Sequence, residues 1–410
     1  MSGHIRWILV TLAGLVLAFG ATRRRAPAIT APELERRLHA APGALENAGA
    51  LVPFFERLRT GSVHILHYGD SHTASDDFPG ALRRELQARF GGGGPGFTLA
   101  GHPYLGYRRF DSRGSQSGGW RTSGTLMHGS DGMEGVGGVS ITAQRSGEAA
   151  TFTAECEHLT LFYLQPPGGG DFEFSVDGEP VRLVATNGAL GPGYLEYEPA
   201  PGPHRFAVRT LTGGAVRLFG WTADNTDGVT YETLGINGAQ ATMVLSWAEE
   251  LLAEHIARRD PALIVVAYGT NEAISPRWDA AAYSVAFRQI LERLRNAAPS
   301  ASILVIGPPD CFFVKQTHRM SSAHLNEVIA IQRAVARESH CAYWNWRRRM
   351  GGPGSVRTWV QAGLSQPDYV HMRSAGYRLA GELLFEELMF HYERSIAAHK
   401  AADAPEENDQ

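Results

Sequence analysis

The segment from Tyr68 to Asp77 reads YGDSHTASDD and follows the apolar run VHIL, so an expected strand ends beside a serine. A serine hydroxyl acts as a nucleophile in acyl transfer when a neighbouring base takes its proton. Ser71 would lie at the carboxyl end of a parallel strand, where ligands bind in open α/β sheets. Gly, Asp and Ser also form ordinary helix-capping turns, so the segment alone does not separate a nucleophile from a turn.

A base for such a serine has its best context near the C-terminus, in PDYVHMRSAGYRLAG. Asp368 and His371 lie there on an expected loop before the last helix. A carboxylate at this spacing can hold the imidazole Nδ1–H while Nε2 faces the serine, as the Ser-His-Asp mechanism requires. A solvated loop histidine after an acidic residue is the alternative. His72 is not expected to be the base, because its side chain leaves the turn beside the nucleophile, and Asp70 is expected to brace that turn.

Two further positions after expected strands suit the stabilisation of an oxyanion. Asn271 follows the most apolar run of the chain, in AYGTNEA, and its amide could point into the same sheet edge. Gly238 follows another strand end, in LGINGAQA, where a backbone N–H could approach a substrate without a Cβ in the way. Acyl transfer needs such donors at the developing negative charge. Each residue alone also suits a turn. The prediction therefore rests on the order in which all these sites follow one another along the chain.

Strands and helices alternate in two separate parts of the chain. The run ALIVVAY is typical of a central parallel strand that is covered on both faces. Amphipathic helices follow the strands, and the last one covers about 374–391. The expected strands of this unit include residues 63–68, 262–268, 302–310 and 342–346. One parallel α/β domain, interrupted by a different unit, is the simplest interpretation.

The interrupting segment lacks helical periodicity and contains short alternating runs such as DFEFSVDG and HRFAVRTL, separated by turns such as PPGGG and PGP. This pattern predicts a β-sandwich. Residues 119–138 are rich in glycine and cannot be assigned to either unit. Trp120, Trp221 and Tyr194 could stack on sugar rings, but burial in the sandwich core is the stronger expectation for such aromatics.

The four candidate sites together resemble the sequence blocks of the SGNH, or GDSL-type, hydrolases. The first block has His72 where many members have Leu. The resemblance covers about residues 60–97 and 229–395, and no G-x-S-x-G of the α/β-hydrolase type is present. The blocks, in chain order, are Gly-Asp-Ser-His around Ser71, then Gly238, then Gly-Thr-Asn ending at Asn271, and Asp368-x-x-His371.

This resemblance implies a three-layer α/β/α fold with a parallel central sheet. It implies Ser71 as the nucleophile, His371 as the base and Asp368 as the acid that orients the base. The Ser71 N–H, the Gly238 N–H and the Asn271 side chain would form the oxyanion hole. No cofactor is implied.

The layout is similar to the peptidoglycan O-acetylesterase branch of this family. Exported members of that branch carry a β domain that resembles a carbohydrate-binding module between their first and second blocks. The expected division is a signal peptide or membrane anchor at 1–25, hydrolase parts at 26–97 and 229–398, a carbohydrate-binding-module-like insert at 98–228, and a disordered tail at 399–410.

Composition excludes several other classes of protein. The formal net charge is -4 and the pI about 6.5, so no polybasic surface indicates nucleic-acid binding. No His-Glu-x-x-His or calcium-loop spacing indicates a metal site. Cys156, Cys311 and Cys341 are odd in number, and the last two would lie at opposite edges of a parallel sheet, so no disulfide is expected. A monomer is expected.

The N-terminus contains the apolar segment 7–21, whose length suits a signal peptide better than a full membrane span. Three arginines at 23–25 oppose translocation of the residues after them, so an uncleaved membrane tether through 7–21 is the alternative. An exported protein, periplasmic or in the cell envelope, is expected.

The motifs and the resemblance together predict a serine esterase that removes O-acetyl groups from a cell-envelope polysaccharide through an acetyl-Ser71 intermediate. The resemblance makes peptidoglycan the first candidate substrate. A glycan O-acetyltransferase that uses the same acetyl-enzyme is the first alternative. A non-catalytic glycan-binding envelope protein is a more distant one. A non-catalytic protein of this kind would be expected to lack one of the four catalytic sequence blocks, and all four are present in this sequence.

Overall fold

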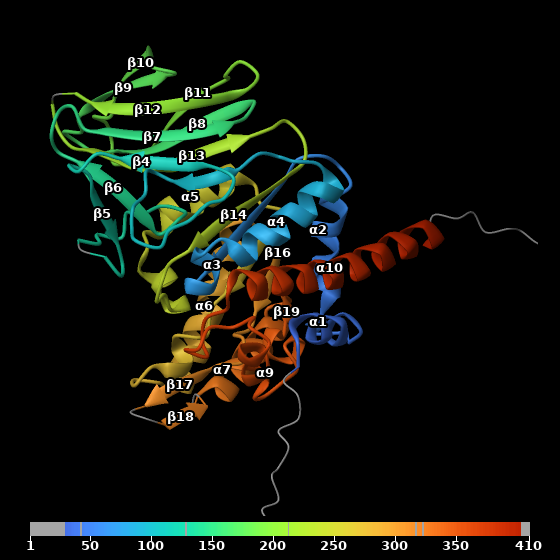
Figure 1. Cartoon of the computed structure of the whole chain (residues 1–410). Helices are drawn as coiled ribbons and strands as arrows, with labels where there is room; N and C mark the ends of the chain where they lie inside the picture. Colours follow the sequence, from blue (N-terminus) through green and yellow to red (C-terminus); the bar gives the residue numbers. More distant parts are fainter. Residues whose placement is uncertain are drawn as a thin grey trace, which may run out of the picture.

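The computed structural model describes residues 29–402, except 42, 128, 212, 316–317 and 322–323. The predicted leader at 1–25 and residues 403–410 of the predicted tail lie outside the described residues. Figure 1 shows an α/β unit with a β-rich unit at one end of it. Among the helices that the structure describes, none combines the length and the apolar character needed to cross a membrane.

A six-stranded sheet forms the centre of the α/β unit, in the order β1-β19-β16-β15-β2-β14. Neighbouring strands run parallel, except that β1 pairs antiparallel with β19. The parallel sheet predicted from the apolar runs is therefore confirmed. Its strands are β1 (Leu45–Glu46), β2 (Val63–Gly69), β14 (Val229–Gly235), β15 (Leu263–Ala267), β16 (Ser302–Ile306) and β19 (Ala342–Trp344).

Helices cover both faces of this sheet. Ile65 of β2 packs in an apolar cluster with α2, α4 and α10, while the next residue, Leu66, packs in a second cluster with α5, α6 and α7. Alternate side chains of a strand point to opposite faces, so a strand buried on both sides needs a continuous apolar run. The helices are α1 (Ala31–His39), α2 (Val52–Arg57), α3 (Ser71–Ala74), α4 (Asp77–Phe90), α5 (Glu249–Arg259), α6 (Ala280–Ala297), α7 (Leu325–Glu338), α8 (Trp346–Arg349), α9 (Ser355–Gln361) and α10 (Ser374–Ala402), with 3-10 helices η1 (Ala48–Leu51), η2 (Ala241–Ser246) and η3 (Glu272–Ile274).

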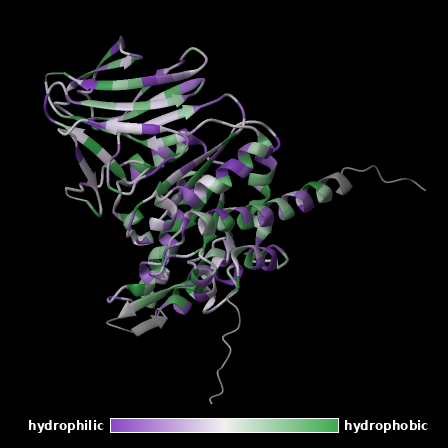
Figure 2. Ribbon diagram, in the orientation of Figure 1, coloured by the Kyte–Doolittle hydropathy of each residue, from purple (hydrophilic) through white to green (hydrophobic). Residues whose placement is uncertain are grey.

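The inserted unit is a sandwich of two antiparallel sheets. Its strands alternate buried and exposed residues, and Figure 2 shows hydrophobic and hydrophilic positions following each other along them. One sheet contains β4 (Arg113–Gln116), β7 (Ala149–Glu155), β9 (Asp171–Val176), β10 (Glu179–Ala185) and β12 (Pro203–Thr210). The other contains β3 (Gly96–Leu99), β5 (Arg121–Gly124), β6 (Val139–Ala143), β8 (His158–Gln165), β11 (Gly191–Tyr197) and β13 (Val216–Asp224). A small hairpin, β17 (Phe312–Lys315) and β18 (His318–Ser321), completes the strands of the described residues.

The chain enters and leaves the insert through two adjacent segments, residues 91–99 and 220–229, which we call the neck. β3 pairs antiparallel with β13 there, and the Val229 N–H donates to the Gly91 carbonyl at 2.9 Å. A Cβ on Gly93 would lie 2.8 Å from the Val229 carbonyl carbon, so the glycine run that ends α4 also permits this close approach. The neck places β2 and β14, which flank the whole insert in the chain, side by side in the central sheet.

An apolar interface joins the insert to the α/β unit. Phe97, Phe162 and Phe219 of the insert belong to the same buried cluster as Leu251 and Ile256 of α5. Residues 119–138, which the sequence does not assign to either unit, pack against both. The Ala248 N–H donates to the carbonyl of Gly132 at 2.7 Å, for example.

Several element boundaries differ from the sequence prediction. Where the sequence predicts one amphipathic helix after the strand that precedes Gly238, the chain forms two elements, η2 and α5. Trp247 adopts an extended backbone there, and buried Arg293 donates to the carbonyls of Val244 and Trp247. The final helix continues to Ala402 and thus through residues 399–402, which were expected in the disordered tail. β4 to β7 were not predicted as strands.

Two expectations about particular side chains are confirmed. All three cysteines are free and buried, so no disulfide joins Cys311 to Cys341. Trp120 and Trp221 are buried in the sandwich core, and Trp221 stacks on Phe152 at 5.8 Å. Tyr194 faces α5 of the α/β unit instead, where the Arg258 guanidinium lies 4.0 Å from its ring centre.

Candidate active site

Ser71 is the first residue of α3, and Asp70 alone separates it from the carboxyl end of β2. Asp70 is the N-cap residue of this short helix, and its Oδ1 accepts the His72 N–H at 2.9 Å. The turn is tight because a Cβ on Gly69 would lie 2.0 Å from Thr73 Oγ1. The strand therefore ends where the sequence predicts, and Asp70 lies in the bracing position expected for it.

His371 and Asp368 lie on the loop between α9 and α10. This loop lies beside Ser71 in the fold, although it is distant from Ser71 in the sequence. Ser71 Oγ is 3.1 Å from His371 Nε2, and His371 Nδ1 is 2.8 Å from Asp368 Oδ2. When Nδ1 carries the proton and donates to the carboxylate, Nε2 is left to accept the serine O–H. This is the hydrogen-bond order that an activated serine requires.

The Asp368 carboxylate is held in this position by its own loop. Its Oδ1 accepts the N–H groups of Val370 at 2.9 Å and His371 at 3.0 Å. Desolvation alone would raise the pKa of Asp368, but these hydrogen bonds and the one from the His371 ring outweigh it and hold the pKa below its usual value. Asp368 is therefore ionised and oriented towards the imidazole at neutral pH.

Gly238 and Asn271 follow β14 and β15, the two neighbours of β2 in the sheet. Gly238 has φ +78°, a conformation that favours glycine, and its N–H donates to no acceptor among the described residues. Asn271 Nδ2 donates to the Ala239 carbonyl at 2.9 Å, which fixes its amide beside the Gly238 loop. An amide nitrogen has two hydrogens, so one remains for a ligand. The oxyanion-hole role of both residues stays a prediction.

Glu272 is a site residue that the sequence analysis missed. Its Oε1 accepts the Ala241 N–H at 2.7 Å, and Gln240 Nε2 donates to the Asn271 carbonyl at 3.2 Å. These bonds connect the two loops that carry Gly238 and Asn271. The only signal in the sequence was the position of Glu272 directly after Asn271.

Two buried carboxyl groups lie beneath these loops, and burial changes how they titrate. Desolvation raises the pKa of Asp70 to about 7, although the His72 N–H, the His371 charge and the Thr270 hydroxyl lower it in part. Desolvation likewise raises the pKa of Glu272 to about 7. Both groups therefore change charge near neutral pH.

His72 is buried and occupied by other contacts. Its Nδ1 is 2.9 Å from the Tyr377 hydroxyl, and its ring packs edge-on against Trp346 at 5.5 Å. Desolvation, with a smaller contribution from the charge of His371, lowers the pKa of His72 to about 3. A neutral, buried imidazole that bonds Tyr377 agrees with the expectation that His72 is not the base.

A cavity of about 440 Å³ opens in front of Ser71 and His371. Gly106 and Arg108 from the insert, and Asn237 from the Gly238 loop, also line it. The insert therefore contributes one wall of the candidate active site.

One group of side chains has the composition of a metal site. His64, Asp224 and Glu232 bring possible ligand atoms within 4.8 Å of one another. The Arg259 guanidinium lies among them, however, and donates to Asp224 at 2.7 Å, to Glu232 at 3.0 Å and to His64 at 3.0 Å. Arginine already supplies the positive charge, so we interpret the group as a buried ion-pair cluster.

Comparison with known proteins gives one family match and several structural matches. Residues 205–379 match the GDSL-like lipase/acylhydrolase family, a range that contains Gly238, Asn271, Asp368 and His371. Among solved structures, the chain is similar to a peptidoglycan O-acetylesterase, with 28% sequence identity, a TM-score of 0.74, and coverage of 86% of this chain and 100% of that chain. A search of curated proteins found no match.

Other solved structures are much less similar. A family two carbohydrate esterase from Clostridium thermocellum has 14% identity and a TM-score of 0.29, covering 61% of this chain and 94% of that one. One from Cellvibrio japonicus has 12% identity and a TM-score of 0.27, covering 69% and 98%. The family match over residues 205–379 and the first structural match both support an SGNH-type carboxylic ester hydrolase, the class that the sequence motifs predict.

Proposed function

We propose that this esterase removes O-acetyl groups from a polysaccharide of the cell envelope, with peptidoglycan as the first candidate. The hydrogen-bonded order Ser71–His371–Asp368 at the mouth of an open cavity carries the proposal. The similarity to a peptidoglycan O-acetylesterase over that protein's whole length supports the choice of substrate.

The first half of the reaction acylates the enzyme. Ser71 Oγ attacks the acetyl carbonyl carbon while His371 Nε2 takes the hydroxyl proton. The negative charge on the carbonyl oxygen is stabilised by the N–H groups of Ser71 and Gly238 and by the Asn271 amide. The bond to the sugar oxygen then breaks, and His371 returns the proton to that oxygen, which leaves as a sugar hydroxyl.

The second half releases acetate. A water molecule gives a proton to His371 Nε2 and attacks the acetyl-Ser71 carbonyl through the same oxyanion donors. The ester bond to Ser71 breaks, and the proton passes to the serine oxygen. Asp368 keeps the imidazole oriented and stabilises its positive charge in both halves.

The test compares two serines on the wall of one cavity. Ser71→Ala should lower the release of acetate from O-acetylated peptidoglycan by about 10³-fold or more, whereas Ser75→Ala should change it by less than about threefold. Acetylated xylan is the comparison substrate. Equal activity of Ser71→Ala and wild type would remove Ser71 from the mechanism. Faster release of acetate from acetylated xylan than from O-acetylated peptidoglycan would contradict the choice of peptidoglycan as the substrate.

The transferase alternative is tested in the same assay. Adding an oligosaccharide acceptor should leave acetate as the main product if water is the second substrate. Acetylated acceptor in excess over free acetate would make the enzyme an O-acetyltransferase. A substrate in the cell envelope requires an exported protein, and this localisation is part of the proposal.

A further inference from the structure

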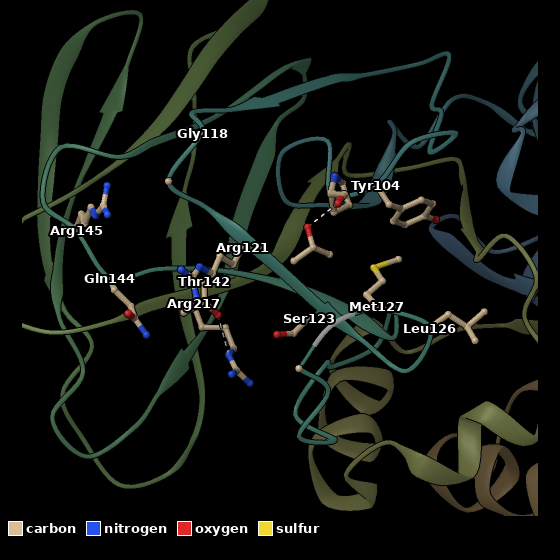
Figure 3. A pocket seen from close by; sticks show the side chains of 14 residues that line it. Tyr104, Gly118, Arg121, Ser123, Leu126, Met127, Thr142, Gln144, Arg145 and Arg217 are labelled. Carbon is tan, nitrogen blue, oxygen red and sulfur yellow. Dashed lines mark hydrogen bonds between the residues drawn. The ribbon is translucent and has the colours of Figure 1, made fainter.

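A second cavity, of about 1050 Å³, lies on the insert beside the candidate active site. β5, Thr142 of β6, and Leu126, Met127 and Gly129 form about half of its wall. Figure 3 shows its lining from Arg145 and Gln144 at one end to Leu126 and Tyr104 at the other. The proposed esterase reaction uses none of these residues.

The lining of this cavity is positively charged. It contains Arg121, Arg145 and Arg217, and no described lining residue is acidic. Arg217 is already paired, because it donates to both oxygens of Asp131 at 2.9 Å each. Arg121 and Arg145 form no ion pair with any residue that the structure describes. Two guanidinium groups are therefore available to a ligand.

The cavity borders the loops that carry the catalytic donors. Leu126, in its wall, has Cδ1 3.7 Å from the position that a Cβ on Gly238 would occupy. The hydroxyl of Tyr104, also in the wall, donates to the Gly235 carbonyl at 2.5 Å. Leu105 is 95% exposed and lies between Tyr104 of this cavity and Gly106 of the Ser71 cavity. A chain bound at Ser71 can thus continue over Leu105 and Leu126 into the arginine-lined cavity.

Guanidinium groups recognise carboxylates and phosphates through paired N–H donors, and a neutral sugar offers them no comparable partner. We propose that this cavity is a subsite for a carboxylate group of the polysaccharide whose acetyl ester is bound at Ser71, with Arg121 and Arg145 as the groups that bind it. This inference rests on the proposed esterase function and narrows its substrate to an acidic glycan.

The test changes the two free arginines together. Arg121→Gln with Arg145→Gln should raise KM for soluble O-acetylated peptidoglycan fragments about tenfold or more, with kcat nearly unchanged, because the subsite acts in binding. KM for neutral acetylated xylo-oligosaccharides and for an aryl acetate should not change. Arg182→Gln on β10, an exposed arginine outside both cavities, is the matched control.

Two further measurements, together with the KM values, decide the inference. Added salt should weaken kcat/KM for the acidic fragments in wild type and much less in the double variant. A phosphate-bearing acetylated glycan that shows the same dependence on both arginines, while carboxylate fragments show none, would overturn the choice of carboxylate. An unchanged KM for all acidic substrates would overturn the subsite.

Failure of the esterase proposal gives a different result. If Ser71→Ala retains wild-type hydrolysis, the reaction mechanism is wrong, and the subsite is then judged by binding alone. Deacetylated peptidoglycan fragments should bind wild type and Ser71→Ala equally and the double arginine variant about tenfold more weakly. Equal binding to all three proteins would exclude the subsite.

Discussion

The Ser71 hydroxyl and the His371 imidazole are 300 residues apart in the sequence and 3.1 Å apart in the fold. His72, the sequence neighbour of Ser71, has its Nδ1 at the Tyr377 hydroxyl and a buried Nε2 without a hydrogen-bond partner among the described residues. Proximity in sequence is therefore a poor guide to which imidazole serves the hydroxyl. The direction of each ring is the better guide.

A pair of histidine variants tests this assignment. His371→Ala should lower kcat for an aryl acetate about 10³-fold, because the serine loses the group that accepts its proton. His72→Gln should keep kcat within about threefold of wild type, although its melting temperature should fall because His72 is buried. An inactive His72→Gln that is folded by circular dichroism, beside an active His371→Ala, would reverse the two roles.

The sequence predicts the residues of the site better than it predicts what supports them. Ser71, His371 and Asp368 stand at the ends of recognisable strands and helices, so their meeting follows from the order of the elements. Glu272 could not be predicted in the same way, because its partner is a backbone N–H on another loop and leaves no pattern in the sequence. Arg121 could not be placed either, since residues 119–138 lack any regular periodicity.

At the scale of elements, the two loops after β14 and β15 form one connected support. Glu272 accepts the Ala241 N–H and Asn271 donates to the Ala239 carbonyl, so hydrogen bonds join the two loops that carry the candidate oxyanion donors. Because the two loops are bonded to each other, the positions of their donors are restricted, as an oxyanion hole requires.

The titration of Glu272 gives a stability prediction with a defined sign. Its pKa is about 7 in the fold and about 4.3 in an unfolded chain. Between these values the folded protein keeps a proton that the unfolded chain has lost, so this group lowers the free energy of unfolding as pH rises through that window. Glu272→Gln cannot titrate and still offers an oxygen to Ala241. The free energy of unfolding of Glu272→Gln, relative to that of wild type, should rise by roughly 3 kcal/mol as the pH increases from about 4 to about 7.5.

Denaturant unfolding of both proteins across this pH range measures the difference. Glu292→Gln on the exposed face of α6 is the matched surface control. A Glu272→Gln difference that is constant with pH, or that falls as pH rises, would contradict the raised pKa.

The packing of β14 against α3 gives a second prediction at this scale. A Cβ on Gly235 would lie 2.3 Å from the Ala74 backbone nitrogen, so Gly235→Ala must displace the helix that begins with Ser71. We expect a loss of about 2 kcal/mol or more of stability, together with a fall in kcat. At Gly92 a Cβ would meet nothing within 4 Å, so Gly92→Ala should change neither the stability nor kcat. If Gly235→Ala unfolds like wild type and has the wild-type kcat, the site tolerates movement of α3.

At the scale of the whole molecule, the Arg259 cluster ties the insert to the hydrolase unit. Arg259 on α5 bonds Asp224 at the end of β13 and Glu232 in the central sheet. Desolvation raises the pKa of Glu232, and the charge of Arg259 offsets part of that rise. The arginine therefore compensates a buried carboxylate as well as joining the units.

Removing that arginine should be costly. Arg259→Met should lower the free energy of unfolding by about 3–5 kcal/mol, because Glu232 would stay buried without its partner. Arg57→Met breaks the exposed pair with Asp260 and should cost less than about 1 kcal/mol. Equal effects of the two variants in urea unfolding would mean that the buried cluster contributes no more than a surface pair.

The overall architecture was predictable from the alternation of apolar runs, turns and helical periodicity. The limits of prediction appear where tertiary contacts override local pattern. The break at Trp247 depends on Arg293, a residue that is distant in sequence. The path of residues 119–138 likewise depends on contacts with α5 and the loop before it.

The neck also has a consequence for the order in which the chain folds. β2 is synthesised before the insert and β14 after it, yet the two must pair in register in the central sheet. Closing a long loop costs entropy before any distant contact repays it. Pairing of β3 with β13 closes that loop within the insert and brings β2 and β14 together. We therefore expect the insert to fold first and to serve as the template on which the catalytic sheet is completed.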